Sequence, residues 1–343
     1  MRSLIARLSR QQLFWPVLAL AALLLVNVIA TPTFFEVRLQ DGHLYGNLVD
    51  ILRNGAPILL VALGMTLVIA TRGIDLSVGA VAAISGAVAC VWIAGADEAS
   101  AGKALVACVL ALIVCLVLGL WNGFLVSVLG IQPIIATLVL MTAGRGVAML
   151  ITGGQITTIN NPTFSRIGGG FVLTLPLAIL IALFVFGLTA ALTRRTALGM
   201  LVEAVGINPE ASRLAGVRAR TIIWTAYLFS AVCAGLAGLM IASNTNAADA
   251  NSAGLWIELD AILAVVIGGT SLAGGRFSLA GTLIGALFLT TLAATIPNIG
   301  IPSETNYLFK AVVVILVCLL QSPKARAALA IRRRQPVQAG AAA

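Results

Sequence analysis

The sequence predicts an all-α polytopic membrane protein with about ten transmembrane helices and both termini in the cytoplasm. Of its 343 residues, 60% are hydrophobic and only 10% are charged, and the mean hydropathy is +1.07. Soluble domains carry about 25% charged residues. Long apolar stretches recur along the chain, as transmembrane helices require. Arginines and lysines gather at both ends and in the loop 193–221, which places these three regions on the cytoplasmic side.

The apolar stretches predict the order of the spans. We expect them at 13–30, 57–71, 74–95, 104–128, 134–151, 172–192, 222–243, 259–269, 278–296 and 308–322. The first is longer than the apolar core of a cleaved signal peptide, so we interpret it as a span. An even number of spans then lies on each side of the basic loop, as cytoplasmic termini require.

Short or broken helices are predicted at 57–71 and 259–269. Each ends in a glycine-rich junction, at 70–79 and at 267–275. Irregular backbone at membrane depth is tolerated only where protein or water satisfies it. Short interrupted segments at corresponding places in two halves often mark a transport path, although glycine-rich loops alone explain the match about as well.

The apolar stretches predict a single transmembrane domain over 13–322. A short cytoplasmic N-terminus, 1–12, precedes it, and a basic cytoplasmic tail, 323–343, follows and is expected to be disordered. The charge on these segments attracts anionic membrane lipid.

The cytoplasmic loop 193–221 is longer than a plain connection requires. Asn208 before Pro209 predicts the N-cap and first position of a short helix, and Gly216 predicts its end. Such a helix can dock into a groove on a soluble partner. A basic loop that only fixes the topology is the more common alternative.

Several classes of function are excluded. The net charge of +9 does not indicate nucleic-acid binding, because it lies in cytoplasmic segments without interleaved aromatic residues. The five cysteines lie in apolar runs and the single histidine, His43, stands alone, so no metal site, disulfide or other cofactor is expected. The glycine-rich run 268–275 lacks the lysine of an ATP-binding P-loop. We therefore expect neither an ATPase site nor an intramembrane enzyme.

A sparse set of polar residues is predicted near membrane depth: Asp75, Asn122, Gln132, Thr137, Arg145, Gln155 and Asp260. A conduit that must release its cargo uses few such groups. Other interpretations remain open for each. Asn122, Gln132 and Thr137 could join helices through hydrogen bonds. Asp75 and Asp260 could cap helices, and Arg145 could pair with an intramembrane carboxylate.

Five motifs carry a resemblance to a known family. They are Gly-Ile-Asp-Leu-Ser-Val-Gly (73–79), Leu-Trp-Asn-Gly (120–123), Gln-Pro-Ile-Ile-Ala-Thr-Leu (132–138), Gly-Arg-Gly (144–146) and Glu-Ala-Val-Gly-Ile-Asn (203–208). In this order they resemble the permease subunits of ribose-type monosaccharide ABC importers. The run 248–269 is most similar to the galactofuranose importer's permeases. Arg72 departs from the pattern, because this family usually has glycine there.

The resemblance implies a subunit of a bacterial inner-membrane complex. Its partners would be a cytoplasmic ABC ATPase, a periplasmic sugar-binding protein and a second permease copy, in a homodimer or heterodimer. The ATPase-coupling residues would be Glu203, Ala204, Gly206, Asn208, Ala211, Leu214 and Gly216. The segment 199–217 would act as a lever for alternating access.

Two rival functions remain open at this stage. A secondary carrier driven by an ion gradient would need a buried ionisable residue in its path, for which Asp75, Arg145 and Asp260 are candidates. A membrane scaffold would need none of them. The sugar itself is open, because a separate binding protein makes much of that choice in this family.

Overall fold

The computed structural model describes residues 13–40, 42–95, 99–300, 302 and 305–321. The predicted N-terminal segment 1–12 and tail 323–343 lie outside the described residues. The helices are α2 (Phe14–Ala30), α3 (Asn47–Ala70), α4 (Val78–Ile93), α5 (Ala101–Ser127), α6 (Pro133–Ile151), α7 (Pro162–Gly169), α8 (Leu177–Arg195), α9 (Leu198–Ile207), α10 (Pro209–Leu214), α11 (Ala219–Thr245), α12 (Ile257–Ile267), α13 (Leu279–Asn298) and α14 (Asn306–Gln321).

The predicted all-helical membrane architecture is confirmed. Within the described residues, six helices are long and apolar enough to cross a membrane, namely α3, α5, α6, α8, α11 and α13. Shorter apolar helices accompany them: α2, α4, α9 and the Leu308–Val317 part of α14. Large apolar side chains such as Leu105 and Leu150 are exposed on the outer helices, which is expected of a surface that faces lipid.

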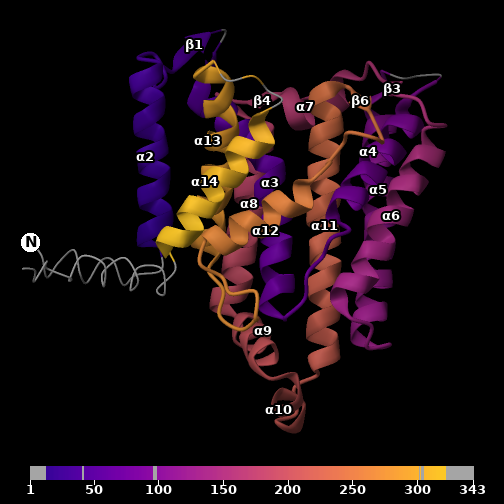
Figure 1. Ribbon diagram of the computed structural model, residues 1–343. Coiled ribbons are helices and arrows are strands. Elements are labelled where there is room, and N and C mark those ends of the chain that lie inside the picture. Colours follow the sequence, from indigo (N-terminus) through magenta and orange to yellow (C-terminus); the bar gives the residue numbers. More distant parts are fainter. Residues whose placement is uncertain (1–12, 41, 96–98, 301, 303–304, 322–343) are drawn as a thin grey trace, which may run out of the picture.

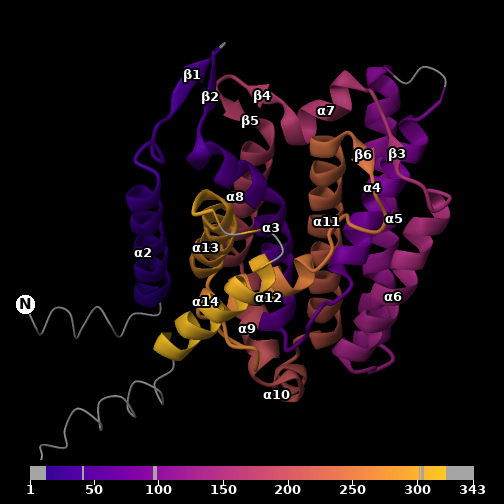
Figure 2. The ribbon, with the colours of Figure 1, turned by 45° about the horizontal axis from the view of Figure 1, so that its top comes forward.

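Helices α3 and α11 form the centre of the bundle (Figures 1 and 2). From Leu59 to Ala70, every residue of α3 is buried. A helix that is apolar on all sides belongs in the interior, and α3 packs against α8, α11, α12 and α13. At Gly64 a side-chain Cβ would lie 2.7 Å from Ser230 Cα of α11. Glycine is required here for the two central helices to approach this closely.

Three small antiparallel sheets lie at one end of the bundle, and α9 and α10 lie at the other (Figure 1). The strands are β1 (Arg38–Gln40), β2 (His43–Tyr45), β3 (Thr157–Thr158), β4 (Phe171–Val172), β5 (Leu175–Pro176) and β6 (Ala247–Ala248), paired as β1–β2, β3–β6 and β4–β5. The Leu44 amide donates to the Thr174 carbonyl over 3.0 Å, which joins the β1–β2 and β4–β5 hairpins.

The prediction of a short helix at 57–71 is wrong. Helix α3 begins at Asn47 and runs through Pro57 as a 24-residue helix. Proline is common at helix starts, but it is also tolerated inside membrane helices when neighbours stabilise the freed backbone. Here Arg53, one turn before Pro57, donates from Nε to the Gly168 carbonyl over 3.1 Å and also bonds Asn244. The polar first turns of α3 are thereby held against α7 and α11.

The short helix predicted at 259–269 is confirmed as α12, which has 11 residues. At about 1.5 Å per residue it is roughly 16 Å long, about half the hydrocarbon thickness of a bilayer. It packs against α3 and α13. In the turn after α12, the Gly275 amide donates to the carbonyl of Ala70 at the end of α3 over 2.9 Å.

Candidate functional site

Asp75 is the centre of a buried polar cluster in the junction between α3 and α4. Its side chain is 2% exposed, and its Oδ1 accepts hydrogen bonds from the Ser77 amide at 3.1 Å and the Ser77 hydroxyl at 2.6 Å. Its Oδ2 accepts from the Ser230 hydroxyl of α11 at 2.9 Å. Ser77, not Asp75, is the N-cap of α4. Asp75 lies two residues before it, and its carboxylate satisfies the Ser77 amide.

Two further predicted residues hold the same junction. Asn122 of α5 donates from Nδ2 to the Ser77 hydroxyl at 2.8 Å. Thr137 of α6 accepts from the Leu76 amide at 3.1 Å through Oγ1, a hydroxyl that also lies 3.2 Å from the Ile74 carbonyl oxygen. These contacts are the interhelical hydrogen bonds that were the alternative to substrate contact for both residues. The irregular backbone between α3 and α4 is thus satisfied by side chains from α5 and α6.

Gln132 and Gln155 do not join this cluster. Gln132 is exposed immediately before α6, and Gln155 is exposed beyond the other end of that helix. Arg145 lies between them on α6. Gln132, Arg145 and Gln155 therefore lie far apart along α6 and do not form one site.

Arg145 reaches the loop between α11 and α12. Its Nη1 donates to the carbonyls of Ala253 at 2.6 Å and Ala250 at 3.0 Å. Nearby, Asp249 accepts from the Ser252 hydroxyl at 2.6 Å. This hydrogen bond lowers the pKa of the Asp249 carboxyl, and the Arg145 charge adds to the shift. Within the described part of the chain, Arg145 has no carboxylate at ion-pair distance, and its side-chain hydrogen bonds go to backbone carbonyls instead.

Glu258 is a buried acidic residue that was not among the predicted site residues. It lies in the first turn of α12, is 3% exposed, and its Oε2 lies against Gly79 at the start of α4. Gly79 leaves room for the carboxylate because any larger residue would collide with it. Acidic residues beside the starts of two helices complement both dipoles. The signal that could have identified Glu258 is an acidic residue directly before the apolar run of a predicted span.

Asp260 forms an ion pair with Lys310 of α14. The Lys310 Nζ lies 2.8 Å from Oδ1 and 2.9 Å from Oδ2, and the two side chains are 15% (Lys310) and 19% (Asp260) exposed. The pair lines a groove of about 700 Å³ between α12 and α14, whose other walls include Trp256, Leu259 and Val314. Asp260 lies in the first turn of α12 rather than at its N-cap, which is Trp256. Lys310 was missed, although a lysine inside the predicted span 308–322 was a usable signal.

The segment that was predicted to couple to an ATPase consists of two helices, α9 and α10, and only α10 was predicted from the sequence. Asn208 accepts from the amides of Ala211 at 3.0 Å and Glu210 at 3.1 Å, so the predicted start of α10 is confirmed. Its predicted end is also confirmed, since Gly216 has a φ of +85° just beyond the helix. Helix α9 was missed, and it contains Glu203, Ala204 and Gly206.

Gly206 lies where α9 meets both glycine-rich junctions. A Cβ at this position would overlap the Ala70 carbonyl oxygen and lie 2.6 Å from the Gly275 amide nitrogen. Gly275 in turn donates to Ala70 over 2.9 Å. The end of α3, the end of α9 and the turn after α12 therefore meet at one place. Beyond this contact, α9 and α10 expose Met200, Ile207, Ala211 and Leu214.

A family model described as "Branched-chain amino acid transport system / permease component" matches residues 47–318. The chain belongs to this family. The permease has no ATPase site of its own, and a separate subunit of the ABC system hydrolyses ATP. A binding protein is the other partner that this architecture implies.

Three relatives extend over nearly the whole permease. It is 51% identical to the galactofuranose transporter permease protein of Escherichia coli (strain K12), over 90% of this chain and 91% of the relative. It is 40% identical to the fructose import permease protein of Bifidobacterium longum (strain NCC 2705), over 93% of this chain and 90% of the relative. It is 38% identical to the ribose import permease protein of Escherichia coli (strain K12), over 89% of this chain and 92% of the relative. The expected resemblance to ribose-type importer permeases is confirmed. No solved structure matches the chain.

Proposed function

We propose that this permease moves a monosaccharide from the periplasm to the cytoplasm by alternating access, with galactofuranose as the first candidate. The observation that carries the proposal is the 51% identity with the galactofuranose permease along 90% of the chain. The fructose and ribose permeases follow at 40% and 38%. These relatives all carry monosaccharides by name, so the substrate class is better supported than the individual sugar.

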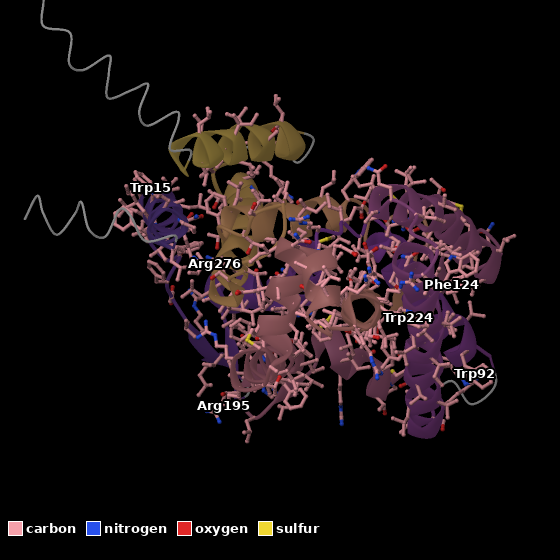
Figure 3. All side chains as sticks on the ribbon, turned by 90° about the horizontal axis from the view of Figure 1, so that it is seen from below. Trp15, Trp92, Phe124, Arg195, Trp224 and Arg276 are labelled. Carbon is pink, nitrogen blue, oxygen red and sulfur yellow. The ribbon has the colours of Figure 1, made fainter. Side chains whose placement is uncertain are left out.

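We further propose one permease domain, 13–322, in a bacterial inner membrane, with ten spans formed by α2, α3, α4, α5, α6, α8, α11, α12, α13 and α14. Because α12 is only about half as long as the hydrocarbon layer is thick, its span includes the non-helical segment between β6 and α12. Both termini and the α9–α10 segment would be cytoplasmic. Supporting this orientation, Arg194, Arg195, Arg213, Arg218 and Arg220 surround α9 and α10. The Phe14 end of α2 lies toward the same end of the molecule as α9 (Figure 1), and Figure 3 views that end with Arg195 at its margin.

The polar residues divide between two proposed roles. We assign Asp260 to the substrate path because it lines the groove between α12 and α14. Arg145, whose guanidinium reaches the loop before α12, remains a path candidate. Gln132, which is exposed at one end of α6, remains a candidate for an opening of the substrate path. Asp75, Asn122 and Thr137 instead hold the α3–α4 junction, because their hydrogen bonds are already made within the protein. A path lined by few polar groups allows the sugar to leave again.

The α9–α10 segment is the proposed contact for the ATPase. Its exposed apolar side chains include Leu214 at 79% and Met200 at 68% exposure, which suits insertion into a groove of a soluble partner. ATP would act by changing how tightly the ATPase binds the two states of the permease. A second permease copy, identical or similar, would complete the translocation unit.

The test is uptake of labelled galactofuranose, ribose and fructose by vesicles that contain this permease, its ATPase and its binding protein. We expect uptake of one sugar that requires ATP and all three proteins and survives collapse of the proton gradient. Uptake by the permease alone that disappears with the gradient would instead establish a secondary carrier. That result would overturn the proposal.

A further inference from the structure

The end of α3 has an arginine at a backbone position that favours glycine. The Arg72 amide donates to the Ile69 carbonyl and the Gly73 amide to the Val68 carbonyl, both over 2.9 Å. This pair of bonds defines a Schellman motif, whose left-handed residue follows the C-cap. That residue is Arg72, with a φ of +65°. A residue with a Cβ is disfavoured in this conformation. The presence of arginine instead of glycine at this position therefore needs an explanation from the contacts of its side chain.

The Arg72 side chain reaches the coupling segment. Its guanidinium donates to the carbonyl of Ile207, the last residue of α9. The last carbonyls of a helix lack partners within the helix and carry the negative end of its dipole. Helix α9 has no basic residue in its own last turn. Arg72 therefore supplies, from a distant part of the chain, the cation that this helix end favours.

The Arg72 side chain also contacts the turn after α12. A Cβ on Gly274 would collide with the Arg72 side chain and lie 3.0 Å from the Gly206 carbonyl oxygen. Because Gly275 also donates to Ala70, the Arg72 stem lies across the place where α3, α9 and the 268–277 turn meet. Three residues beyond Arg72 lies Asp75, the centre of the buried cluster that positions α4.

We propose that Arg72 is a positioning residue that ties the movement of α9 to the α3–α4 junction. This inference rests on the proposed function, in which an ATPase moves the α9–α10 segment. With the guanidinium bond in place, a displacement of α9 is transmitted to the end of α3. Without it, α9 keeps the packing contact of Gly206 but loses its side-chain hydrogen bond to the end of α3, so less of its displacement is transmitted to the junction.

The experiment measures two quantities on the same variants. The first is the number of galactofuranose molecules taken up per ATP hydrolysed, in vesicles with the ATPase and binding protein. The second is the thermal unfolding temperature of the purified permease. Arg72→Gly removes the guanidinium but suits the backbone, Arg72→Ala removes it and keeps the unfavourable conformation, and Arg72→Lys keeps a donor. Arg276→Ala is the control for loss of one charge, because Arg276 is an exposed arginine of the neighbouring turn.

We expect Arg72→Gly to lower the sugar-to-ATP ratio roughly threefold or more without lowering the unfolding temperature. Arg72→Ala should show the same loss with a lower unfolding temperature, and Arg72→Lys should recover part of the ratio. Arg276→Ala should leave the ratio unchanged. The inference is overturned if Arg72→Gly keeps the ratio of the unmodified complex, or if the loss follows stability and appears only in Arg72→Ala. Failure of the unmodified complex to use ATP for uptake would overturn the proposed function instead.

Discussion

At the scale of single residues, the ion pair between Asp260 and Lys310 joins two helices that have few other contacts. Both groups lie mostly out of water, where an unpaired charge is costly. The groove beside the pair opens between apolar walls, so each charge depends mainly on the other. Exchanging the two residues therefore tests whether stability depends on the ion pair itself.

We predict that Asp260→Asn lowers permease stability by on the order of 3 kcal/mol and abolishes uptake, because it leaves the Lys310 ammonium without its carboxylate. The double variant Asp260→Lys, Lys310→Asp should recover stability. Thermal unfolding and vesicle uptake measure the two effects. A single variant as stable as the unmodified permease would show that the pair has no structural role.

Gly206 gives a second prediction at this scale. Gly206→Ala places a methyl group against the Ala70 carbonyl and the Gly275 amide, so α9 must move away. Overpacking typically costs about 1–3 kcal/mol, and we expect uptake to fall at least tenfold while the ATPase alone is unaffected. The matched control is Gly187→Ala in α8, where a Cβ meets no atom within 4 Å. Equal activity of both variants would contradict a tight α9 contact.

At the scale of elements, the six residues of α10 depend on their cap. Asn208→Ala removes the acceptor of two amides and should destabilise this helix by about 1 kcal/mol. We expect weaker binding of the ATPase, measured by co-purification, and Asn208→Asp should retain it. Loss of binding in the Asp variant as well would assign Asn208 a direct contact.

The Glu210–Arg213 ion pair on α10 serves as a comparison with the Asn208 cap. Both side chains are 67% exposed, and such pairs contribute little. The Arg213 hydrogen bond lowers the pKa of the Glu210 carboxyl, so the small stabilisation is present at neutral pH and is lost as the pH falls through the lowered pKa. Glu210→Gln should therefore leave ATPase binding nearly unchanged at neutral pH.

The sequence predicted some elements well for identifiable reasons. The start of α10 was predicted because Asn208-Pro209 acts locally, and α12 because its apolar run is short between polar segments. The start of α3 was not, because Arg53 is held by Gly168 and Asn244 from distant helices. Helix α9 was missed because it lies within the basic loop 193–221, whose charge pattern indicated a connection between spans. Likewise, Lys310 could be connected with Asp260 only once α12 and α14 were placed side by side.

At the scale of the whole molecule, the proposed orientation puts the α10 and the β4–β5 ends on opposite sides of the membrane. Leu173, in the β4–β5 turn, is 88% exposed, and Arg213 of α10 is also exposed. In a variant whose native cysteines are replaced by serine, we predict that an impermeant thiol reagent labels Leu173→Cys on cells with a permeabilised outer membrane. Arg213→Cys should be labelled only after the inner membrane is opened. The reverse pattern would invert the topology.

The hydrogen bond from Gly275 to Ala70 also has a consequence for how the permease is made. Ala70 is inserted early, during synthesis of the first third of the chain, whereas Gly275 emerges only after α12. Until then the end of α3 lacks the amide that later satisfies its carbonyl, and Gly206 lacks one wall of its contact. A nascent chain that stops before α12 therefore leaves the Ala70 carbonyl without this donor, and cellular chaperones and proteases act on incompletely folded chains of this kind.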